Sequence, residues 1–200
     1  MTKEQITSET TLHLYVTSNC TNHCPLCCNR EYPVDQIPIV SPEELKTVNT
    51  LCITGGEPLL YPGKVRSLIE DISIECWKSK WTNLKNQKVY IYTSGRELVP
   101  KVSQDFIGFA SGFSIGPKSY KDWKVVEVLL RESCLSAYKN NRLYIFPEWE
   151  KVYKEFEETY LAELTRSFEV IHRSWQKKFE PAQNSVFRRL PVLFSASDKL

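Results

Sequence analysis

The sequence lacks the features that mark membrane proteins and nucleic-acid-binding proteins. No apolar run approaches the roughly 18 residues that a membrane span requires. The first ten residues carry charges where a secretion signal has its apolar core. The formal net charge is only +2, from 26 basic and 24 acidic residues, so no strong field attracts nucleic acid or an anionic membrane. We therefore expect a cytoplasmic protein with no membrane partner and no nucleic-acid signature.

The sequence also shows no sign of disorder, low complexity or internal repeats. Its contents of 42% hydrophobic, 12% aromatic and 25% charged residues are those of an ordinary globular protein. A chain of 200 residues buries roughly 70% of its unfolded surface and needs no disulfide to form a core. We expect one domain over residues 1–200, with residues 176–200 as a C-terminal extension that packs on the rest.

Short β-rich runs alternate along the chain with segments of helical periodicity, which is typical of parallel βα units. Six strands are predicted, over residues 12–17, 50–54, 88–93, 112–116, 142–146 and 168–174. Helices are predicted after a capping box at Ser41–Glu44, and over residues 62–77, 98–106, 120–138, 147–164 and 181–190. The pattern predicts an α/β fold with parallel strands.

Seven cysteines are present, and four of them fall within nine residues, as Cys20, Cys24, Cys27 and Cys28. An odd count without an export signal favours ligands or free thiols over disulfides. Three thiolates at C-x3-C-x2-C spacing can converge on one face of an iron–sulfur cube and leave its fourth iron open. A structural zinc site with Cys28 or His23 as fourth ligand is the alternative.

Glycine is scarce, yet two of the seven glycines are the adjacent Gly55 and Gly56, followed by Glu57 and Pro58. A sharp turn of this composition leaves backbone amides and carbonyls accessible and can hold a small zwitterion, although an ordinary β-turn has the same composition. The cysteine loop and the glycine turn each follow a predicted strand. Both are therefore expected at the carboxyl edge of the sheet, where parallel α/β folds hold their active sites.

Together, these two motifs resemble the radical S-adenosylmethionine (SAM) superfamily, whose members carry a CxxxCxΦC loop and a GGEP-like turn on a partial (β/α)6 barrel. The resemblance implies that three thiolates bind three irons of a [4Fe-4S] cluster and that the fourth iron chelates SAM. The implied cluster ligands are Cys20, Cys24 and Cys27, and the implied holders of the SAM amino group are Gly55, Gly56 and Glu57. On this basis the turn contacts SAM through its backbone and does not touch the irons.

The resemblance further implies reductive cleavage of SAM to a 5'-deoxyadenosyl radical that abstracts hydrogen from a substrate. The electron comes from a donor such as flavodoxin or ferredoxin. Thr93, Ser94 and Ser114 resemble the family's polar positions that meet the ribose and methionyl groups, with ordinary turn and strand residues as the alternative. In size the chain resembles activators of glycyl-radical enzymes and synthases of deazapurine-type molecules, and its substrate stays open.

Some residues depart from the family pattern or admit two interpretations. Leu26 stands before the third cysteine, where the family usually has an aromatic residue, and residues 143–147 lack the glycine pattern beside adenine. We interpret His172 as a structural histidine on a strand, with its ring hydrogen-bonded, and not as a catalytic residue. The basic residues near strand ends and the terminus either bind an anionic substrate or face solvent; they are Arg96, Lys118, Arg142, Arg188 and Arg189. The alternative to an enzyme is a non-catalytic zinc-binding module.

Overall fold

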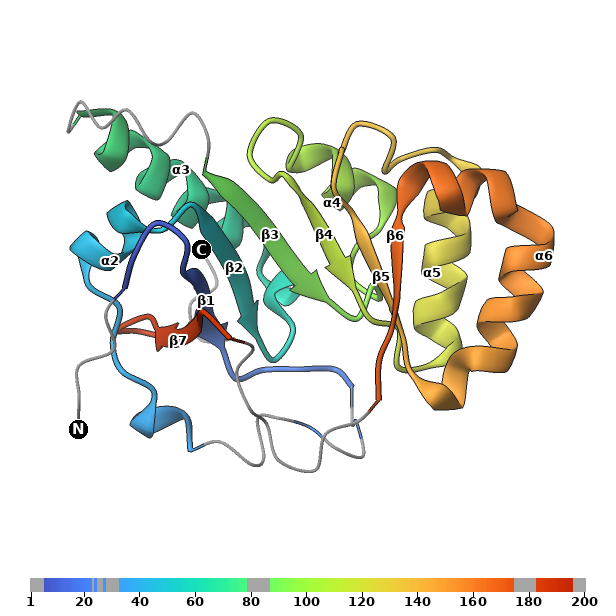
Figure 1. The fold of residues 1–200 in the computed structure, drawn as a ribbon, viewed down its shortest axis with the longest axis horizontal. Coiled ribbons are helices and arrows are strands. Elements are labelled where there is room, and N and C mark those ends of the chain that lie inside the picture. The colour runs from blue at the N-terminus through green and yellow to red at the C-terminus, as the bar shows by residue number, and fades with distance from the viewer. Residues whose placement is uncertain are drawn as a thin grey trace.

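The computed structural model describes residues 6–22, 24, 27, 33–78, 87–174 and 183–195. Within these ranges, seven strands form one parallel sheet in the order β6-β5-β4-β3-β2-β1-β7 (Figure 1). The strands are β1 (Thr11–Thr17), β2 (Thr50–Gly55), β3 (Lys88–Thr93), β4 (Gly112–Ile115), β5 (Arg142–Ile145), β6 (Glu169–His172) and β7 (Ser185–Arg189). The sheet is open between β6 and β7 in the described residues, as a partial barrel is. The predicted α/β class with parallel strands is confirmed.

The helices lie between the strands, as the periodicity predicted. They are α2 (Pro42–Thr47), α3 (Pro62–Lys78), α4 (Pro100–Asp105), α5 (Tyr120–Arg131) and α6 (Glu150–Ser167), with 3-10 turns η1 (Val34–Gln36), η2 (Pro58–Leu60) and η4 (Pro147–Trp149). The predicted capping box opens α2, since Ser41 Oγ accepts from Glu44 N at 3.2 Å and Glu44 Oε2 accepts from Ser41 N at 2.8 Å. No helix in the described ranges is long and apolar enough to cross a membrane.

Helix α5 ends seven residues before its predicted end at Tyr138. Ser133 adopts a φ of +51°, and the amide of Cys134 donates to the carbonyl of Leu129 at 3.1 Å, which is a left-handed C-terminal cap. Leu135 and Tyr138 remain buried beyond this point. Their apolar periodicity therefore belongs to a turn that packs back on the core and not to a longer helix.

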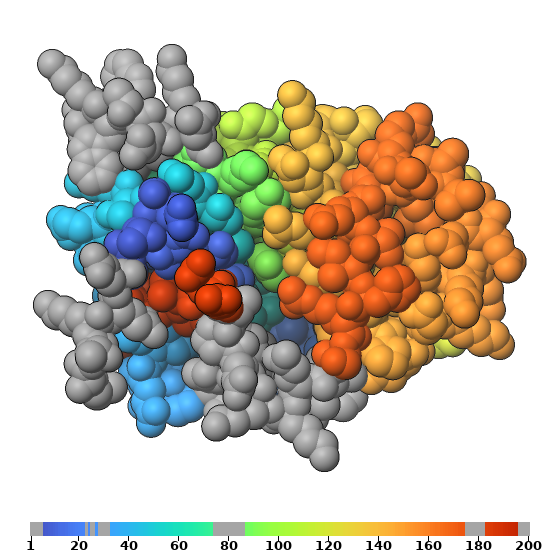
Figure 2. All heavy atoms as spheres, in the orientation of Figure 1, coloured from blue at the N-terminus to red at the C-terminus, as the bar shows by residue number. Residues whose placement is uncertain are grey.

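The helix predicted over residues 181–190 is wrong, because Ser185–Arg189 forms the strand β7, which pairs in parallel with β1. Its burial alternates with period two, and Val186 and Arg188 face inward. Beyond β7, Phe194 N donates to Val16 O at 2.8 Å, and Thr17 Oγ1 donates to Phe194 O at 2.9 Å. Figure 2 shows these C-terminal residues beside the N-terminal ones on the surface.

The two faces of the sheet differ in composition. One face packs on the helices through aliphatic side chains, among them Leu14, Ile53 and Ile91 against Val65 and Val126. Alternate positions point to the opposite face, where the paired positions carry aromatic and polar side chains, namely His13, Cys52, Tyr90, Tyr92, Ser114, Arg142, Tyr144 and Phe187. This second face is the interior of the partial barrel, and the loops at its carboxyl edge form the candidate site.

Candidate functional site at the carboxyl edge of the sheet

The three predicted cysteine ligands lie in the loop that leaves β1. Cys20, Cys24 and Cys27 are partly buried free thiols, and the backbone amide of Asn22 donates to Cys20 Sγ at 3.4 Å. Burial raises the pKa of Cys20, and raises that of Cys24 to about 11; the nearby Cys27 sulfur raises both further. The structure therefore brings the three thiols into mutual electrostatic range.

The described part of this loop does not form a compact site for a single metal ion. Among the described residues, no three His, Cys, Asp or Glu side chains are grouped closely enough to hold a single metal ion. His23, Leu26 and Cys28 lie outside the described residues. The proposed alternatives for the fourth zinc ligand and for the adenine contact therefore stay predictions.

The glycine turn packs directly against the start of the cysteine loop. Gly56 N donates to Thr17 O and Glu57 N donates to Asn19 O, both at 2.7 Å. A Cβ atom on Gly55 would lie 2.4 Å from Thr17 O, and one on Gly56 would lie 2.1 Å from Asn19 O. Gly55 also has a φ of +145°, which disfavours any other residue. The turn needs two glycines because backbone meets backbone here.

This packing changes the expectation that the turn acts on SAM alone. Asn19 immediately precedes Cys20, so any side chain at Gly56 would push against the chain that carries the first predicted iron ligand. A substitution at Gly56 is therefore expected to disturb the chain that carries Cys20, even though the turn itself is not expected to touch the irons. The turn supports the cysteine loop whether or not it also contacts a ligand.

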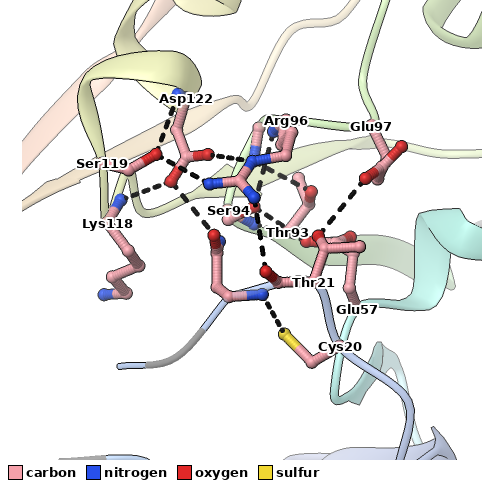
Figure 3. Close-up of polar contacts among 12 residues, drawn as sticks. Cys20, Thr21, Glu57, Thr93, Ser94, Arg96, Glu97, Lys118, Ser119 and Asp122 are labelled. Carbon is pink, nitrogen blue, oxygen red and sulfur yellow. Dashed lines mark hydrogen bonds and ion pairs between the residues drawn. The ribbon is translucent and has the colours of Figure 1, made fainter. Parts of the chain in front are cut away.

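Glu57 lies behind the turn as a buried carboxylate, with only 1% of its surface exposed. Its Oε2 atom accepts hydrogen bonds from Ser94 N at 2.9 Å and Ser94 Oγ at 3.0 Å (Figure 3). Its Oε1 atom accepts from Leu59 N at 3.2 Å. Burial raises the pKa of Glu57, while these hydrogen bonds act in the opposite direction. Thr93 Oγ1 accepts from Gly95 N at 3.0 Å. The structure thus joins Glu57, Thr93 and Ser94 in one network that ties the β2 turn to the end of β3.

Ser114 differs from the other predicted site residues because its hydroxyl has no partner among the residues that the structure describes. It lies on β4, pairs in register with Tyr92, and is 1% exposed. Its Oγ atom makes no hydrogen bond with any described residue. A buried hydroxyl without a partner costs about 1–3 kcal/mol, so such atoms usually meet a ligand or a water molecule.

Asp122, which the sequence analysis did not single out, is the second buried carboxylate of the site and is fully inaccessible. Arg96 Nε donates to its Oδ1 atom at 2.9 Å. Lys118 N and Asn22 Nδ2 donate to its Oδ2 atom at 2.8 Å and 3.4 Å (Figure 3). Asp122 therefore connects the cysteine loop with the loops after β3 and β4.

Arg96 completes this connection and is not a free cation. Its Nη2 atom donates to Ser119 Oγ at 2.8 Å, and its Nη1 atom donates to Thr21 O at 3.3 Å. We call Arg96, Ser119 and Asp122 the loop clasp, because they hold residues 21 and 22 between the first two cysteines. The sequence Ser119-x-x-Asp122 is a local N-cap pattern at the start of α5, in which Ser119 Oγ accepts from Asp122 N at 3.3 Å. It did not reveal the pairing with Arg96.

The other basic residues named from the sequence differ in whether they lie near the cysteine loop. Lys118 lies near Cys24, whose pKa its charge lowers against the larger effect of burial, and its Nζ atom lies 3.1 Å from the Phe146 ring centroid. His172 Nδ1 lies 3.1 Å from Glu150 Oε2. Arg188 pairs with Glu44 at 2.8 Å and Arg189 Nε donates to Ile37 O at 3.0 Å. The structure places these last two arginines beside α2 and η1, engaged in contacts that hold β7.

Comparisons with known proteins give structural likenesses only. No family model and no curated protein matches the sequence. The solved structure of native anSMEcpe with bound AdoMet and Cp18Cys peptide is 15% identical, with a TM-score of 0.48, and covers 81% of this chain and 50% of that chain. The corresponding structure with Kp18Cys peptide is 16% identical, with a TM-score of 0.49 and the same coverage. This chain spans about half the length of the structures it matches.

Proposed function

We propose that this chain is a radical SAM enzyme. The observation that carries the proposal is the junction of two motifs at one sheet edge. Cys20, Cys24 and Cys27 follow β1, the Gly55-Gly56-Glu57 turn follows β2, and backbone hydrogen bonds of 2.7 Å join the two segments. Soft thiolate ligands beside a backbone turn that offers carbonyl groups are what an iron–sulfur cluster and an amino-acid-like cosubstrate require.

The residues present fit both groups. Three free thiols within electrostatic range of each other match a cluster with one iron left open. The unpaired, buried hydroxyl of Ser114 provides a hydrogen-bonding atom on the same face of the sheet. When bound, a reduced [4Fe-4S] cluster would supply the one electron for cleavage of SAM into methionine and a 5'-deoxyadenosyl radical, which would take a hydrogen atom from the substrate.

Each residue of the site has a proposed task. The three cysteines hold the cluster, and the carbonyl groups of Gly55 and Gly56 accept the amino group of SAM. Lys118, near Cys24, neutralises the SAM carboxylate. The Ser114 hydroxyl binds the ribose or methionyl part.

The buried network behind these contacts keeps the cosubstrate site in shape. Glu57 holds the turn against the end of β3 through hydrogen bonds of 2.9 and 3.0 Å from Ser94, and Thr93 Oγ1 accepts from Gly95 N at 3.0 Å within the loop that follows β3. The loop clasp holds the chain between Cys20 and Cys24. An electron donor of the flavodoxin or ferredoxin kind completes the proposed system. The substrate reaction is that of an activase or a small-molecule synthase.

The proposal is tested by metal analysis and product formation. Anaerobically reconstituted protein is expected to hold iron and sulfide, to absorb visible light, and to form 5'-deoxyadenosine from SAM after reduction. Cys20→Ala should lose the cluster and the product, whereas Cys134→Ala, which changes a cysteine after α5, should keep both. A colourless wild-type protein that binds zinc would overturn the proposal in favour of a structural cysteine loop.

A further inference from the structure

A phenol and a thiol lie together in the barrel interior, just inside the carboxyl edge of the sheet. Tyr92 on β3 is partly buried, and Cys52 on the neighbouring strand β2 is 1% exposed (Figure 1). The register pairs Cys52 with Tyr90, so Tyr92 lies on the same face, one pleat nearer the carboxyl edge. The Tyr92 side chain hydrogen-bonds toward the Cys52 sulfur. We call Tyr92 and Cys52 the interior donor pair.

Aromatic rings hold Tyr92 from two sides. Its ring stacks on that of Tyr144 on β5, with the centroids 6.1 Å apart and the planes at 22°. The His13 ring on β1 meets it edge-on at 5.6 Å. The hydroxyl oxygens of Tyr92 and Tyr144 lie 3.5 Å apart. The Tyr92 hydroxyl is thereby fixed in position, as a group that meets a reacting atom must be.

Both members of the interior donor pair keep their protons at neutral pH. Burial raises the pKa of Cys52 to about 12, against smaller opposing effects of the Arg142 charge and the Tyr92 hydrogen bond. Burial is also the largest cause that raises the pKa of Tyr92. A thiol that keeps its proton is a poor nucleophile and a poor metal ligand. Its S–H bond and the phenol O–H bond are nevertheless weaker than an aliphatic C–H bond, so each can give a hydrogen atom to a carbon radical.

A second, independent observation points to a ligand beside Tyr92. Ser114 on β4 pairs in register with Tyr92 and lies on the same face of the sheet. Its hydroxyl is buried and has no partner among the described residues, and such atoms usually meet a ligand or a water molecule. Tyr92 also directly precedes Thr93 and Ser94, which the sequence analysis assigned to the cosubstrate site. A molecule that bonds to Ser114 would therefore lie next to Tyr92.

We propose that Tyr92 gives a hydrogen atom to a carbon-centred radical formed at the candidate site, and that Cys52 restores this atom. The inference rests on the proposed function, which is the source of such a radical. In the first step the Tyr92 O–H bond breaks homolytically and a C–H bond forms, so the carbon gains one proton and one electron. The resulting tyrosyl radical then takes a hydrogen atom from the Cys52 thiol. One electron from the flavodoxin-like or ferredoxin-like donor and one proton from water convert the thiyl radical back to the thiol.

This sequence of steps also defines the class of the substrate reaction. The 5'-deoxyadenosyl radical takes a hydrogen atom from the substrate, and the product radical receives its hydrogen atom from Tyr92. SAM is therefore consumed in each turnover and not regenerated. The donor supplies two electrons, one for the cleavage of SAM and one for the return of the thiol. The substrate consequently leaves as an isomer or as fragments of itself, without net oxidation.

Deuterium labelling in the absence of substrate tests the step assigned to Tyr92. Reconstituted protein is equilibrated in D2O, so that exchangeable O–H and S–H groups carry deuterium, and is then reduced with dithionite in thiol-free buffer that contains SAM. Mass spectrometry gives the deuterium content per molecule of 5'-deoxyadenosine. Because the O–D bond of water is too strong to give its atom to a carbon radical, deuterium in this product comes from the protein. We expect one deuterium in most of the wild-type product and the loss of most of this label in Tyr92→Phe.

Tyr90→Phe is the matched control. Tyr90 lies on the same strand and the same face, is 3% exposed, and is one pleat farther from the carboxyl edge, so this variant should keep the label. Cys52→Ala should also keep it in the first turnover, but its tyrosyl radical should accumulate and give a stronger electron paramagnetic resonance signal than the wild type. Equal loss of label in Tyr90→Phe and Tyr92→Phe, or loss in Tyr144→Phe alone, would overturn the assignment to Tyr92.

A measurement on the metal-free protein tests the position of Tyr92 without the cluster or SAM. The absorbance difference between wild type and Tyr92→Phe in the phenolate band is followed as the pH is raised. We expect no ionisation step near the ordinary tyrosine pKa of about 10, because burial raises the pKa of this phenol. A step at that pH would place the Tyr92 hydroxyl in solvent and overturn the donor role.

The two proposals fail in different ways. Wild-type protein that forms 5'-deoxyadenosine without deuterium would overturn the role of Tyr92 and leave the enzymatic proposal standing. Reconstituted wild-type protein that forms no 5'-deoxyadenosine would overturn both proposals, since the interior donor pair would then have no radical to receive its hydrogen atom.

Discussion

Replacing Gly56 by alanine is the sharpest test of how the glycine turn and the cysteine loop depend on each other. The added methyl group would lie 2.1 Å from Asn19 O, 2.6 Å from Asn19 C and 2.8 Å from Ser18 O. These atoms belong to the backbone and cannot rotate away. One of the two chains must therefore move by roughly 1 Å or more before an ordinary contact distance is restored.

The cost follows from the hydrogen bonds that stand in the way of this movement. Gly56 N to Thr17 O and Glu57 N to Asn19 O, both 2.7 Å long, join the two segments that the methyl group separates. Each bond contributes about 1 kcal/mol net, and overpacking of a tight site costs a further 1–3 kcal/mol or so. We expect Gly56→Ala to lower the free energy of unfolding by about 2–5 kcal/mol. Because Asn19 precedes Cys20, iron content after reconstitution should fall as well.

Gly63→Ala is the control, because an added Cβ there meets nothing within 4 Å. Gly63 lies in the first turn of α3, so alanine should leave stability unchanged or raise it by about 0.5–1 kcal/mol. Urea unfolding and iron analysis of both variants give the answer. A Gly56→Ala protein with wild-type stability and wild-type iron would show that the close contact does not exist, and the argument for a coupled turn and loop would fail.

Three further predictions concern the buried polar groups. Arg96→Met should leave Asp122 without its cation and loosen the cysteine loop. We therefore expect the free energy of unfolding to fall by about 2–4 kcal/mol and the iron content to fall several-fold. Arg188→Met is the control: it breaks an ion pair of similar length, 2.8 Å, and should lose stability in urea unfolding but keep its iron. Since the pKa of His13 is lowered to about 4, the unfolded chain binds more protons between pH 6.5 and 4, and stability should fall by up to about 3 kcal/mol as pH drops through this range. His13→Phe should remove that part of the acid sensitivity in pH-dependent unfolding, and an unchanged pH profile would contradict it. Glu57→Gln should cost about 1–3 kcal/mol in urea unfolding, because an amide NH2 would face donors; a variant as stable as the wild type would show that these hydrogen bonds are dispensable.

Much of the sheet could be predicted because buried parallel strands are short apolar runs. All six predicted strands occur within two residues of their predicted bounds. The seventh, β7, was missed because its sequence Ser-Val-Phe-Arg-Arg mixes charge with apolar residues. Arg188 is buried only because Glu44 of α2 pairs with it at 2.8 Å, and a partner 144 residues away leaves no local signal.

In the candidate site, too, local sequence patterns could be predicted and long-range contacts could not. The cysteine spacing and the Gly-Gly-Glu turn are local patterns, and the sequence placed both at the carboxyl edge, where the structure has them. The sequence could not show that Glu57 accepts from Ser94, 37 residues away, or that Arg96 reaches Asp122, 26 residues away. Such pairs depend on which loops the strand order brings together. What the sequence did not show is therefore which residues pair between loops, whereas the residues of each motif could be named from the sequence.

The two buried carboxylates explain how a site built from loops is held in one arrangement. Loops at the carboxyl edge lie beyond the hydrogen-bonded ladder of the sheet, so side chains must fix them in addition to the two backbone hydrogen bonds between the loops after β1 and β2. Glu57 accepts from Ser94 N, Ser94 Oγ and Leu59 N, and Asp122 accepts from Arg96, Lys118 N and Asn22. A buried carboxylate is costly unless such donors surround it, so movement of any one loop leaves a charge under-bonded. The described residues 19–22 at the start of the cysteine loop and the loops after β2, β3 and β4 consequently hold one another in place.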